Sequence, residues 1–392
     1  MKKHLFCLLL AFLMLFSVGA GALAEDDEEV SIEIYSSDGR LLFTDTPAEE
    51  EEPVEEAPAE EAPKTEKLNI QPDGSILLTL SFTGDVTIGD NVQSKGTSIF
   101  EKELKKQAGN INFPFRNVRD IFLADDLTMI NFEGTLTTAG RNRNKTGNEF
   151  LFRANPEYVS MLNFGGVDTV TLENNHVLDM GEDGLKETKY TLNEAGISYA
   201  CEGEPAIITV QTVKIGSLAY QTFGGRHDEI IAKLPQDIQA LRDQGCEIVI
   251  VSYHWGAEKD YTPNENQVRL GRATIDAGAD LVIGHHSHRI NPIEYYNGHY
   301  ICYSLGNFSF AGNNKPSDMS TYIFQIRFGV KDGQAATKAF RIIPCRISSR
   351  TDYNDFCPTP YTKSENISSV QTVLLQNSQG LEYAVEEYPL TW

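Results

Sequence analysis

Residues able to bind a metal ion follow five separate apolar segments of this 392-residue chain. The segments have the composition of buried strands, and each ends at a carboxylate, an amide or an imidazole side chain. The residues in question are Asp85, Glu133, Asn175 with His176, His254, and His286 with His288. Because the carboxyl ends of the strands share one edge in an open α/β sheet, we expect these side chains to converge in one crevice.

The densest cluster is the segment 284–288, Gly-His-His-Ser-His, which holds three of the chain's eight histidines. Two imidazoles at i and i+2 of an extended segment point to the same side and can share a metal region. A single histidine at a strand end can be a core residue, so the interpretation depends on the whole set. Together the five sites offer ligands for two divalent ions, which would bind an anionic or carbonyl oxygen and generate hydroxide near neutral pH.

The elements expected to position these residues alternate between strand and helix. Apolar segments such as 75–82, 128–133 and 247–254 are each followed by an amphipathic segment, which is the pattern of parallel βαβ units. An adjacent pair of strands over 204–223 is expected to form a hairpin.

From Pro292 onward the pattern changes to consecutive strands, including one over 299–310. Asn297-Gly298 and Asp332-Gly333 are typical hairpin turns between them. A parallel α/β half followed by an antiparallel β half predicts the α/β class, as a four-layer α/β/β/α sandwich.

The amino-terminal region predicts export. Lys2 and Lys3 precede an apolar run over 5–20, and the small-x-small pattern of residues 22–24 fits a signal-peptidase site. We therefore expect residues 1–24 to be a signal peptide, with an uncleaved membrane anchor as the alternative. The expected location is extracellular or in the cell envelope.

Residues 25–66 predict an acidic, disordered tether. They contain 17 acidic and 2 basic residues and are rich in Glu, Pro and Ala, a composition that repels itself and buries nothing. A strand or two could form between Ser31 and Phe43. The net charge of the whole chain is −23, and the absence of a basic stripe argues against nucleic acid as a partner.

Residues 67–345 are expected to form the main domain, and residues 346–392 an appended segment that packs on it. Removal of the signal peptide leaves five cysteines, and an odd number defines no disulfide framework. Cys345 and Cys357 are the one pair close enough in sequence to suggest a bridge.

The order of these motifs resembles the CapA family of poly-γ-glutamate capsule biosynthesis proteins. The motifs that carry the resemblance are Gly84-Asp85, Asn131 to Gly134, Asn174-Asn175-His176 with Asp179 and Gly181, His254-Trp255-Gly256 with Glu258, Gly284 to His288, and Ser304 to Phe308. This family is in turn similar to the calcineurin-like metallophosphoesterases. The resemblance spans about residues 77–325 and implies a metallophosphoesterase-like fold with divalent metal ions, expected to be two and to be Mn, Fe or Zn.

The resemblance also implies roles for single residues. The metal ligands would be Asp85, Glu133, Asn175, His254, His286 and His288. His176 stands in the place of the catalytic histidine, and Asp85 is expected to share in catalysis. Thr87 departs from the phosphoesterase pattern, which has a histidine two residues after the first aspartate.

Substrate contacts are expected from residues beside these positions, namely Asn174, His285 and Asn307. An anionic polymer would also need cations, and Arg226 is the candidate we select, with Arg153 and Arg289 as further possibilities.

Three functions fit these patterns. The first is making, exporting or anchoring poly-γ-glutamate through a metal centre that acts on a γ-glutamyl or related carbonyl. Its partners would be a γ-glutamyl polymer or another anionic substrate, and membrane-bound capsule synthesis proteins. The second is an exported metal-dependent phosphoesterase of unknown substrate. The third is a non-catalytic module that binds an anionic polymer.

Overall fold

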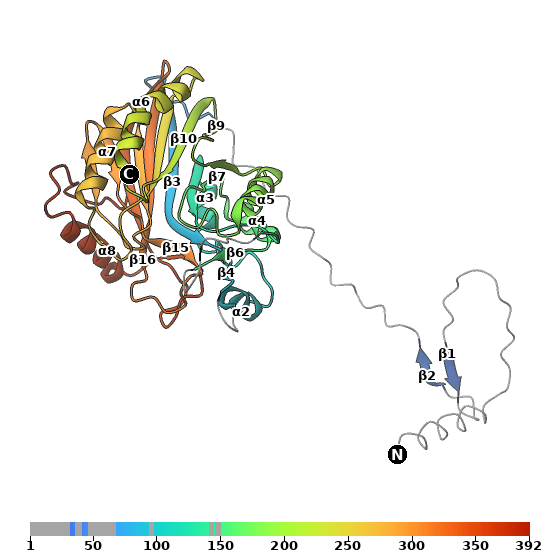
Figure 1. Ribbon diagram of the computed structural model, residues 1–392. Helices are drawn as coiled ribbons and strands as arrows, with labels where there is room; N and C mark the ends of the chain where they lie inside the picture. The colour runs from blue at the N-terminus through green and yellow to red at the C-terminus, as the bar shows by residue number, and fades with distance from the viewer. Residues whose placement is uncertain (1–31, 36–40, 46–67, 94–97, 141–144, 146–149) are drawn as a thin grey trace. The chain divides into compact units, whose positions relative to one another are not determined.

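The computed structural model describes residues 32–35, 41–45, 68–93, 98–140, 145 and 150–392 (Figure 1). The chain divides into two units, Met1–Glu61 and Ala62–Trp392. In the first unit, β1 (Ile32–Tyr35) pairs antiparallel with β2 (Leu41–Asp45). The expected signal peptide and most of the expected tether lie outside the described residues. Within the described part, every helix is too short or too polar to span a bilayer.

Two large β-sheets form the centre of the second unit. The strands of the first are β9 (Ala206–Val210), β10 (Val213–Gln221), β11 (Ile248–His254), β12 (Leu281–His285), β13 (Ile293–Tyr296) and β14 (His299–Cys302). Their order in space is β13-β14-β12-β11-β10-β9. The four strands β10, β11, β12 and β14 are parallel, and β9 and β13 run antiparallel at the two edges.

The second sheet has eight strands. They are β3 (Ile76–Thr87), β5 (Leu127–Phe132), β7 (Thr169–Thr171), β8 (Ser198–Ala200), β15 (Asn307–Phe310), β16 (Ser320–Lys331), β17 (Gln334–Arg346) and β18 (Thr359–Pro360). Their order is β18-β17-β16-β3-β5-β7-β8, and β15 pairs with β3. The strands β3, β5, β7 and β8 are parallel, so their carboxyl ends meet at one edge. A separate small sheet pairs β4 (Asp90–Asn91) with β6 (Phe152–Arg153).

Alternating side chains of the central strands fill two different cores. Ile248 and Ile250 of β11 join the apolar cluster between the two sheets, whereas Val249 and Val251 join the cluster on the other face. This is the period of two that an extended strand imposes. Both faces of the central strands are therefore buried, which explains why they are apolar throughout.

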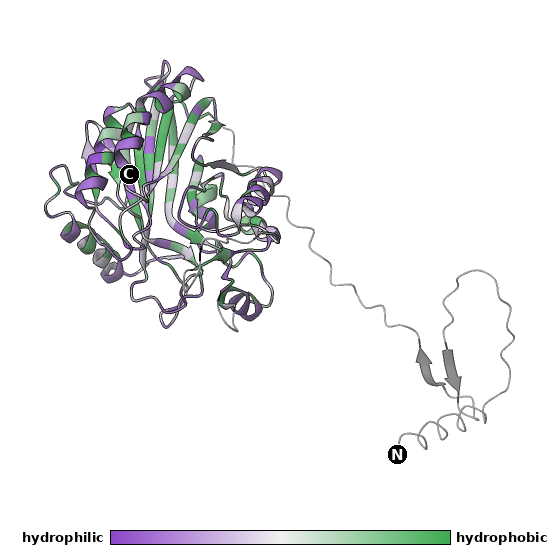
Figure 2. Ribbon diagram, viewed as in Figure 1, coloured by the Kyte–Doolittle hydropathy of each residue, from purple (hydrophilic) through white to green (hydrophobic). Residues whose placement is uncertain are grey.

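Helices cover the outer face of each sheet. On the first sheet, α6 (His227–Asp243) and α7 (Glu265–Asp276) pack through a cluster that includes Leu234 and Leu270. On the second sheet, α3 (Arg119–Leu123), α4 (Val159–Gly165) and α5 (Gly181–Glu194) pack through Phe122, Leu162 and Leu192. Figure 2 shows apolar strands between helices with polar outer faces. The predicted four-layer α/β/β/α sandwich is confirmed.

Two shorter helical segments complete this side of the unit. They are α2 (Ile99–Lys106) and the 3-10 turn η1 (Pro156–Tyr158). Phe100 of α2 is fully buried in the apolar cluster that lies on the outer face of the second sheet.

The expected hairpins are confirmed. Strands β9 and β10 pair antiparallel, as do β13 with β14 and β16 with β17. At the turn between β13 and β14, Asn297 has φ 47° and Gly298 has φ 85°. These are the positive values that a tight two-residue hairpin turn requires.

The single strand expected over 299–310 is wrong, because the chain leaves one sheet and enters the other. Strand β14 ends at Cys302 in the first sheet, and β15 begins at Asn307 in the second. Gly306 takes a left-handed conformation at the crossing, with φ 79°. A Cβ atom on Gly84 would lie 2.0 Å from the Gly306 carbonyl oxygen, so the two backbones approach as closely as glycine allows. The crossing brings Asn307 beside Asp85.

Residues 346–392 contribute to the core between the sheets. They form β18 and α8 (Ser364–Asn377), and Leu374 of α8 lies in the same cluster as Tyr388. The Ile293 amide donates to the Tyr388 hydroxyl at 3.1 Å. The bridge suggested for Cys345 and Cys357 is wrong: both are free thiols, buried in the core.

Candidate metal centre

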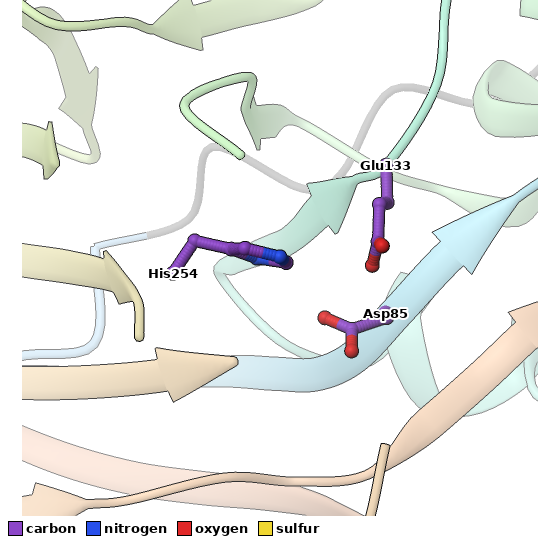
Figure 3. Close-up of side chains that lie close together, drawn as sticks. All are labelled: Asp85, Glu133 and His254. Atoms are coloured by element: carbon purple, nitrogen blue, oxygen red, sulfur yellow. The ribbon is translucent and has the colours of Figure 1, made fainter. Parts of the chain in front are cut away.

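Three buried side chains form the centre of the site. Asp85 comes from β3, Glu133 directly follows β5, and His254 ends β11. Each offers one ligand atom, and these atoms lie within 4.8 Å of one another. Figure 3 shows the three side chains pointing toward one another from separate strands. The crevice therefore joins the carboxyl edges of both sheets.

The histidines at the end of β12 and directly after it complete the cluster. Nδ1 of His285 lies 3.3 Å from Asp85 Oδ1, and Nδ1 of His288 lies 3.1 Å from Asp85 Oδ2. His286 Nδ1 lies 3.0 Å from His254 Nε2. The carboxylate of Asp85 thus contacts the imidazoles of His285 and His288, while the imidazoles of His254 and His286 contact each other.

The loop that carries these histidines has an unusual backbone. His286 has φ 93° and His288 has φ 54°, in the region that favours glycine. Such conformations cost of order 1–3 kcal/mol each and cluster at functional sites. The Lys259 amide donates to the Ser287 carbonyl at 2.7 Å, and the Arg289 guanidinium donates to the His288 carbonyl at 2.7 Å. The surrounding structure therefore holds the loop in place from both sides.

Asn131 orients the Asp85 carboxylate. These two residues are paired in the register of β3 and β5, and the Asn131 amide donates to Asp85 Oδ1 at 2.8 Å. The Asn131 oxygen accepts from Thr171 and Asn174, each at 3.2 Å. This role of Asn131 was not predicted, although Asn131 lies two residues before Glu133 and so on the same face of the extended segment.

His176 is held by a second buried carboxylate. Its Nδ1 lies 2.7 Å from Asp179 Oδ2, and its Nε2 lies 3.6 Å from Glu133 Oε1. Asp179 also accepts from the Phe152 amide at 2.6 Å and from the Lys145 ammonium. In the sequence, Asp179 stood out only as part of the motifs that carry the family resemblance, and Lys145 belonged to none of them. The i, i+3 spacing of His176 and Asp179 was the sequence signal for their contact.

Asn174 and Arg226, both expected to contact the substrate, bind other groups of the protein instead. Asn174 is fully buried, and its amide group donates to Phe132 O at 2.9 Å and to Asn131. The carbonyl oxygen of the same side chain accepts from the His176 amide at 3.0 Å. All its polar atoms support the loop, so it has none to offer a substrate.

Arg226 differs from the expectation in a similar way. Its guanidinium donates to both oxygens of Glu202 and to Glu229, at 3.0 Å for the nearer Glu229 contact. These carboxylates pair with the Arg226 guanidinium, which was expected to bind an anionic polymer.

Thr87 stands at the position that departs from the phosphoesterase pattern. It donates to the Glu133 carbonyl at 2.5 Å.

Unpaired buried atoms test whether a metal ion fits the site. Buried polar atoms almost always have a hydrogen-bond partner, because leaving them unpaired is costly. Side-chain atoms without one in the described part of the chain include Glu133 Oε1 and Oε2, Asn175 Oδ1 and Asn307 Oδ1. All belong to the strand ends that form the crevice. Oxygen and imidazole nitrogen atoms are the donor set that divalent first-row metals accept, so the residues fit such an ion.

The pKa values of the Asp85 and Glu133 carboxylates also indicate a cation site. Burial raises the pKa of Asp85, but hydrogen bonds from His285 and His288 outweigh it and hold that pKa well below its usual range. Burial and the neighbouring charge of Asp85 raise the pKa of Glu133 well above its usual range. Two buried carboxylates this close therefore oppose each other's ionisation, and a bound cation would relieve the conflict.

The imidazoles divide into charged and neutral rings. Burial lowers the pKa of His288, but Glu133 and Asp85 outweigh it and raise it to about 9. Burial lowers the pKa of His254, and a neighbouring imidazole, His286, lowers it further. Burial and the charge of His288 lower the pKa of His286 to about 4. Neutral imidazole is the form that binds metal, so His254 and His286 are ready to do so.

These observations define an α/β/β/α protein with a candidate divalent-metal centre at the shared carboxyl edge of its two sheets. The family model for the bacterial capsule synthesis protein PGA_cap matches residues 79–311. The chain belongs to this family.

Curated relatives agree with this assignment. The PGA biosynthesis protein CapA of Bacillus subtilis is 29% identical over 348 residues, which cover 84% of this chain and 86% of that protein. The capsule biosynthesis protein CapA of Bacillus anthracis is 28% identical over 273 residues, 64% of each chain. A probable polyglutamine synthesis accessory protein of Mycobacterium tuberculosis is 33% identical over 211 residues, 47% of this chain and 55% of that protein.

Among solved structures, the calcineurin-like phosphoesterase YfkN from Bacillus subtilis is similar with a TM-score of 0.41 at 15% identity. The similarity covers 78% of this chain and 100% of that chain.

Proposed function

We propose that this chain is an exported cell-envelope protein of capsule synthesis that acts on poly-γ-glutamate through a divalent-metal centre. The observation that carries the proposal is the convergence of Asp85, Glu133 and His254 with the histidines of segment 285–288, in a member of a capsule synthesis family. Asp85, Glu133, Asn175, His254, His286 and His288 would hold the metal. Asn307, which pairs with Asp85 in β15 and has an unpaired buried oxygen, would line the same crevice.

The chemistry follows from the donor set. A divalent ion bound here would polarise a γ-glutamyl carbonyl oxygen and lower the pKa of water. In this proposal His176 would move a proton. The Asp179 carboxylate accepts from Nδ1, which leaves the Nε2 lone pair facing Glu133 and the crevice.

Export and partners belong to the same proposal. Residues 1–24 would direct the chain out of the cytoplasm, and residues 25–66 would form an acidic tether at the amino terminus of the exported chain. Membrane-bound capsule synthesis proteins would then meet the folded unit outside the cell.

The test compares metal content and activity of the full chain with those of two glutamate variants. Glu133→Gln removes a charge from the crevice and keeps the shape of the side chain. Glu294→Gln is the matched control, because Glu294 is equally buried but pairs with Arg272 and Tyr303 away from the site. After reconstitution with Mn, Fe or Zn, we expect stoichiometric metal in the wild type and in the control, and little in Glu133→Gln. Elemental analysis gives this readout.

Activity then separates the alternatives. A γ-glutamyl peptide and a generic phosphodiester are offered to each loaded protein. Hydrolysis of the γ-glutamyl peptide that disappears in Glu133→Gln supports the proposal. Cleavage of the phosphodiester alone would support the phosphoesterase alternative instead. Metal without either activity would leave the polymer-binding module, and no stoichiometric metal in any reconstitution would refute the metal centre.

A further inference from the structure

The outer face of the hairpin formed by β16 and β17 carries two arginines that make no ion pair with any carboxylate of the described residues. Ile326 and Phe328 of β16 point into the core between the sheets, so Arg327 between them points to the opposite face. Arg341 of β17 lies opposite Gln325, two residues from Arg327, and thus on the same face. Both arginine side chains are half-buried.

The hydrogen bonds of these arginines go to neutral groups. Arg327 Nε donates to Thr79 Oγ1 at 3.3 Å, and Arg341 Nε donates to Gln325 Oε1 at 2.8 Å. Within the described ranges, the structure records no ion pair for either guanidinium. Two other half-buried arginines are each paired, Arg242 with Asp280 at 2.7 Å and Arg272 with Glu294 at 2.6 Å. Neither Arg327 nor Arg341 therefore makes an ion pair of the kind that Arg242 and Arg272 make.

The pKa values of Arg327 and Arg341 agree with the lack of an ion pair at either guanidinium. Burial lowers the pKa of Arg327 and outweighs the opposing effect of Asp126. Burial lowers the pKa of Arg341, and the positive charge of Arg327 lowers it further. An anion beside both guanidinium groups would remove this repulsion.

Trp392 adds an apolar surface to the two cations. The centroid of its ring lies 4.0 Å from the Arg327 guanidinium carbon and 4.7 Å from that of Arg341, and the side chain is 38% exposed. Arg327 faces the small residue Ala339 across the strand pair. Lys338 is an exposed residue at the bulge beside Ala339, and its side chain lies over Gly329 on the same face.

We propose that Arg327, Arg341 and Trp392 form a binding site for the carboxylates of an anionic polymer, separate from the metal centre. Each residue of a γ-linked glutamyl polymer carries one free carboxylate and has two methylene groups in the backbone. The planar guanidinium groups can each bind a carboxylate with two hydrogen bonds, and the methylene groups can pack on the Trp392 ring. The choice of this polymer rests on the proposed function, whereas the carboxylate chemistry rests on the residues alone.

The net charge of the chain sharpens this inference. At −23, the protein repels a polyanion over most of its surface, so binding needs a local cationic site. Because salt screens exposed charges within about 10 Å at 0.1 M, that long-range repulsion weakens at physiological ionic strength while contacts at half-buried arginines persist.

The test measures protection of Trp392 by poly-γ-glutamate in the full chain. The chain has two tryptophans, and Trp255 is fully buried, so acrylamide quenching of fluorescence reports on Trp392. We expect the polymer to reduce quenching, and free glutamate at the same carboxylate concentration to have little effect. Equal protection by free glutamate, or none by the polymer, would overturn the proposal. The measurement needs no variant, so it stands even where a substitution prevents folding.

Variants locate the binding. Arg327→Gln with Arg341→Gln should weaken polymer affinity roughly a hundredfold, because two charged contacts are lost. Arg350→Gln is the matched control, since Arg350 also stacks on an aromatic ring, that of Tyr353, but pairs with Asp352. The double variant should keep its bound metal and γ-glutamyl hydrolysis of a short peptide. Unchanged polymer affinity in a folded double variant refutes this site and leaves the metal centre untouched.

Discussion

Asp85 is a buried carboxylate held by four different groups. Two imidazoles contact its two oxygens, Asn131 donates to Oδ1, and the His286 amide lies 3.4 Å from Oδ2. A buried charge is costly unless it is paired and hydrogen-bonded, and residues that orient a metal ligand affect metal affinity nearly as much as the ligands. Asn131 is the clearest residue of this kind in the crevice.

We therefore predict that Asn131→Leu weakens metal binding by about 10–100-fold, because Asp85 loses the group that orients it. Calorimetric titration of the metal-free protein measures the change. Asn163→Leu is the control, since the Asn163 amide bonds the Ala195 carbonyl away from the site. Equal affinity in the Asn131 variant and the wild type would mean that the carboxylate keeps its orientation without this amide.

At the scale of elements, the segment after β11 connects His254 to α7. The helix begins with a capping box: Asn264 accepts from the Gln267 amide at 3.1 Å, and the Gln267 side chain accepts from the Asn264 amide at 3.0 Å. Gln267 also packs on Gly256, where a Cβ atom would lie 2.7 Å from it. The cap thus holds both the helix and the start of the loop that follows His254.

Removing the cap should destabilise the fold without removing a ligand. We predict that Asn264→Ala lowers the free energy of unfolding by about 1 kcal/mol, measured by urea denaturation. Asn266→Ala in the same turn is the control, because Asn266 is exposed and does not cap the helix. If both variants lose the same stability, the capping box is not the cause.

At the scale of the whole molecule, the core between the sheets depends on residues far apart in the chain. It includes Leu78 of β3, Ile250 of β11, Phe324 of β16 and Tyr388 near the carboxyl terminus. Tyr388 is 2% exposed, accepts from the Ile293 amide, and shares a hydrogen bond with Ser378 at 3.2 Å. The last segment therefore closes the interface between the two sheets.

We predict that Tyr388→Ala lowers the free energy of unfolding by about 3–5 kcal/mol, because a large side chain leaves the core. Tyr388→Phe should cost about 1 kcal/mol, since it removes only the hydroxyl. Tyr383→Ala serves as the control, because that side chain is 39% exposed. A small effect of Tyr388→Ala in urea denaturation would show that the carboxyl-terminal segment is not part of the cooperative unit.

Much of the fold could be predicted from local patterns. The apolar strands, the helices between them and the two-residue turns such as Asn297-Gly298 depend on side-chain period and turn chemistry, which act within a few residues. The break between β14 and β15 could not be predicted, because both halves have strand composition and only packing decides which sheet each one joins. The same holds for the free thiols of Cys345 and Cys357, whose pairing requires geometry that sequence separation does not supply.

For the site, the sequence by itself determined which residue types stand at the strand ends, because parallel strands must bring those ends to one edge. The tertiary structure alone decided which side chains face the crevice and which support it. Asn174 and Asn175 are neighbours in sequence, yet one has all its polar atoms bonded and the other keeps an unpaired buried oxygen. Such differences arise from contacts between distant segments, and so do the partners of Arg226, Arg327 and Arg341, which no local pattern encodes.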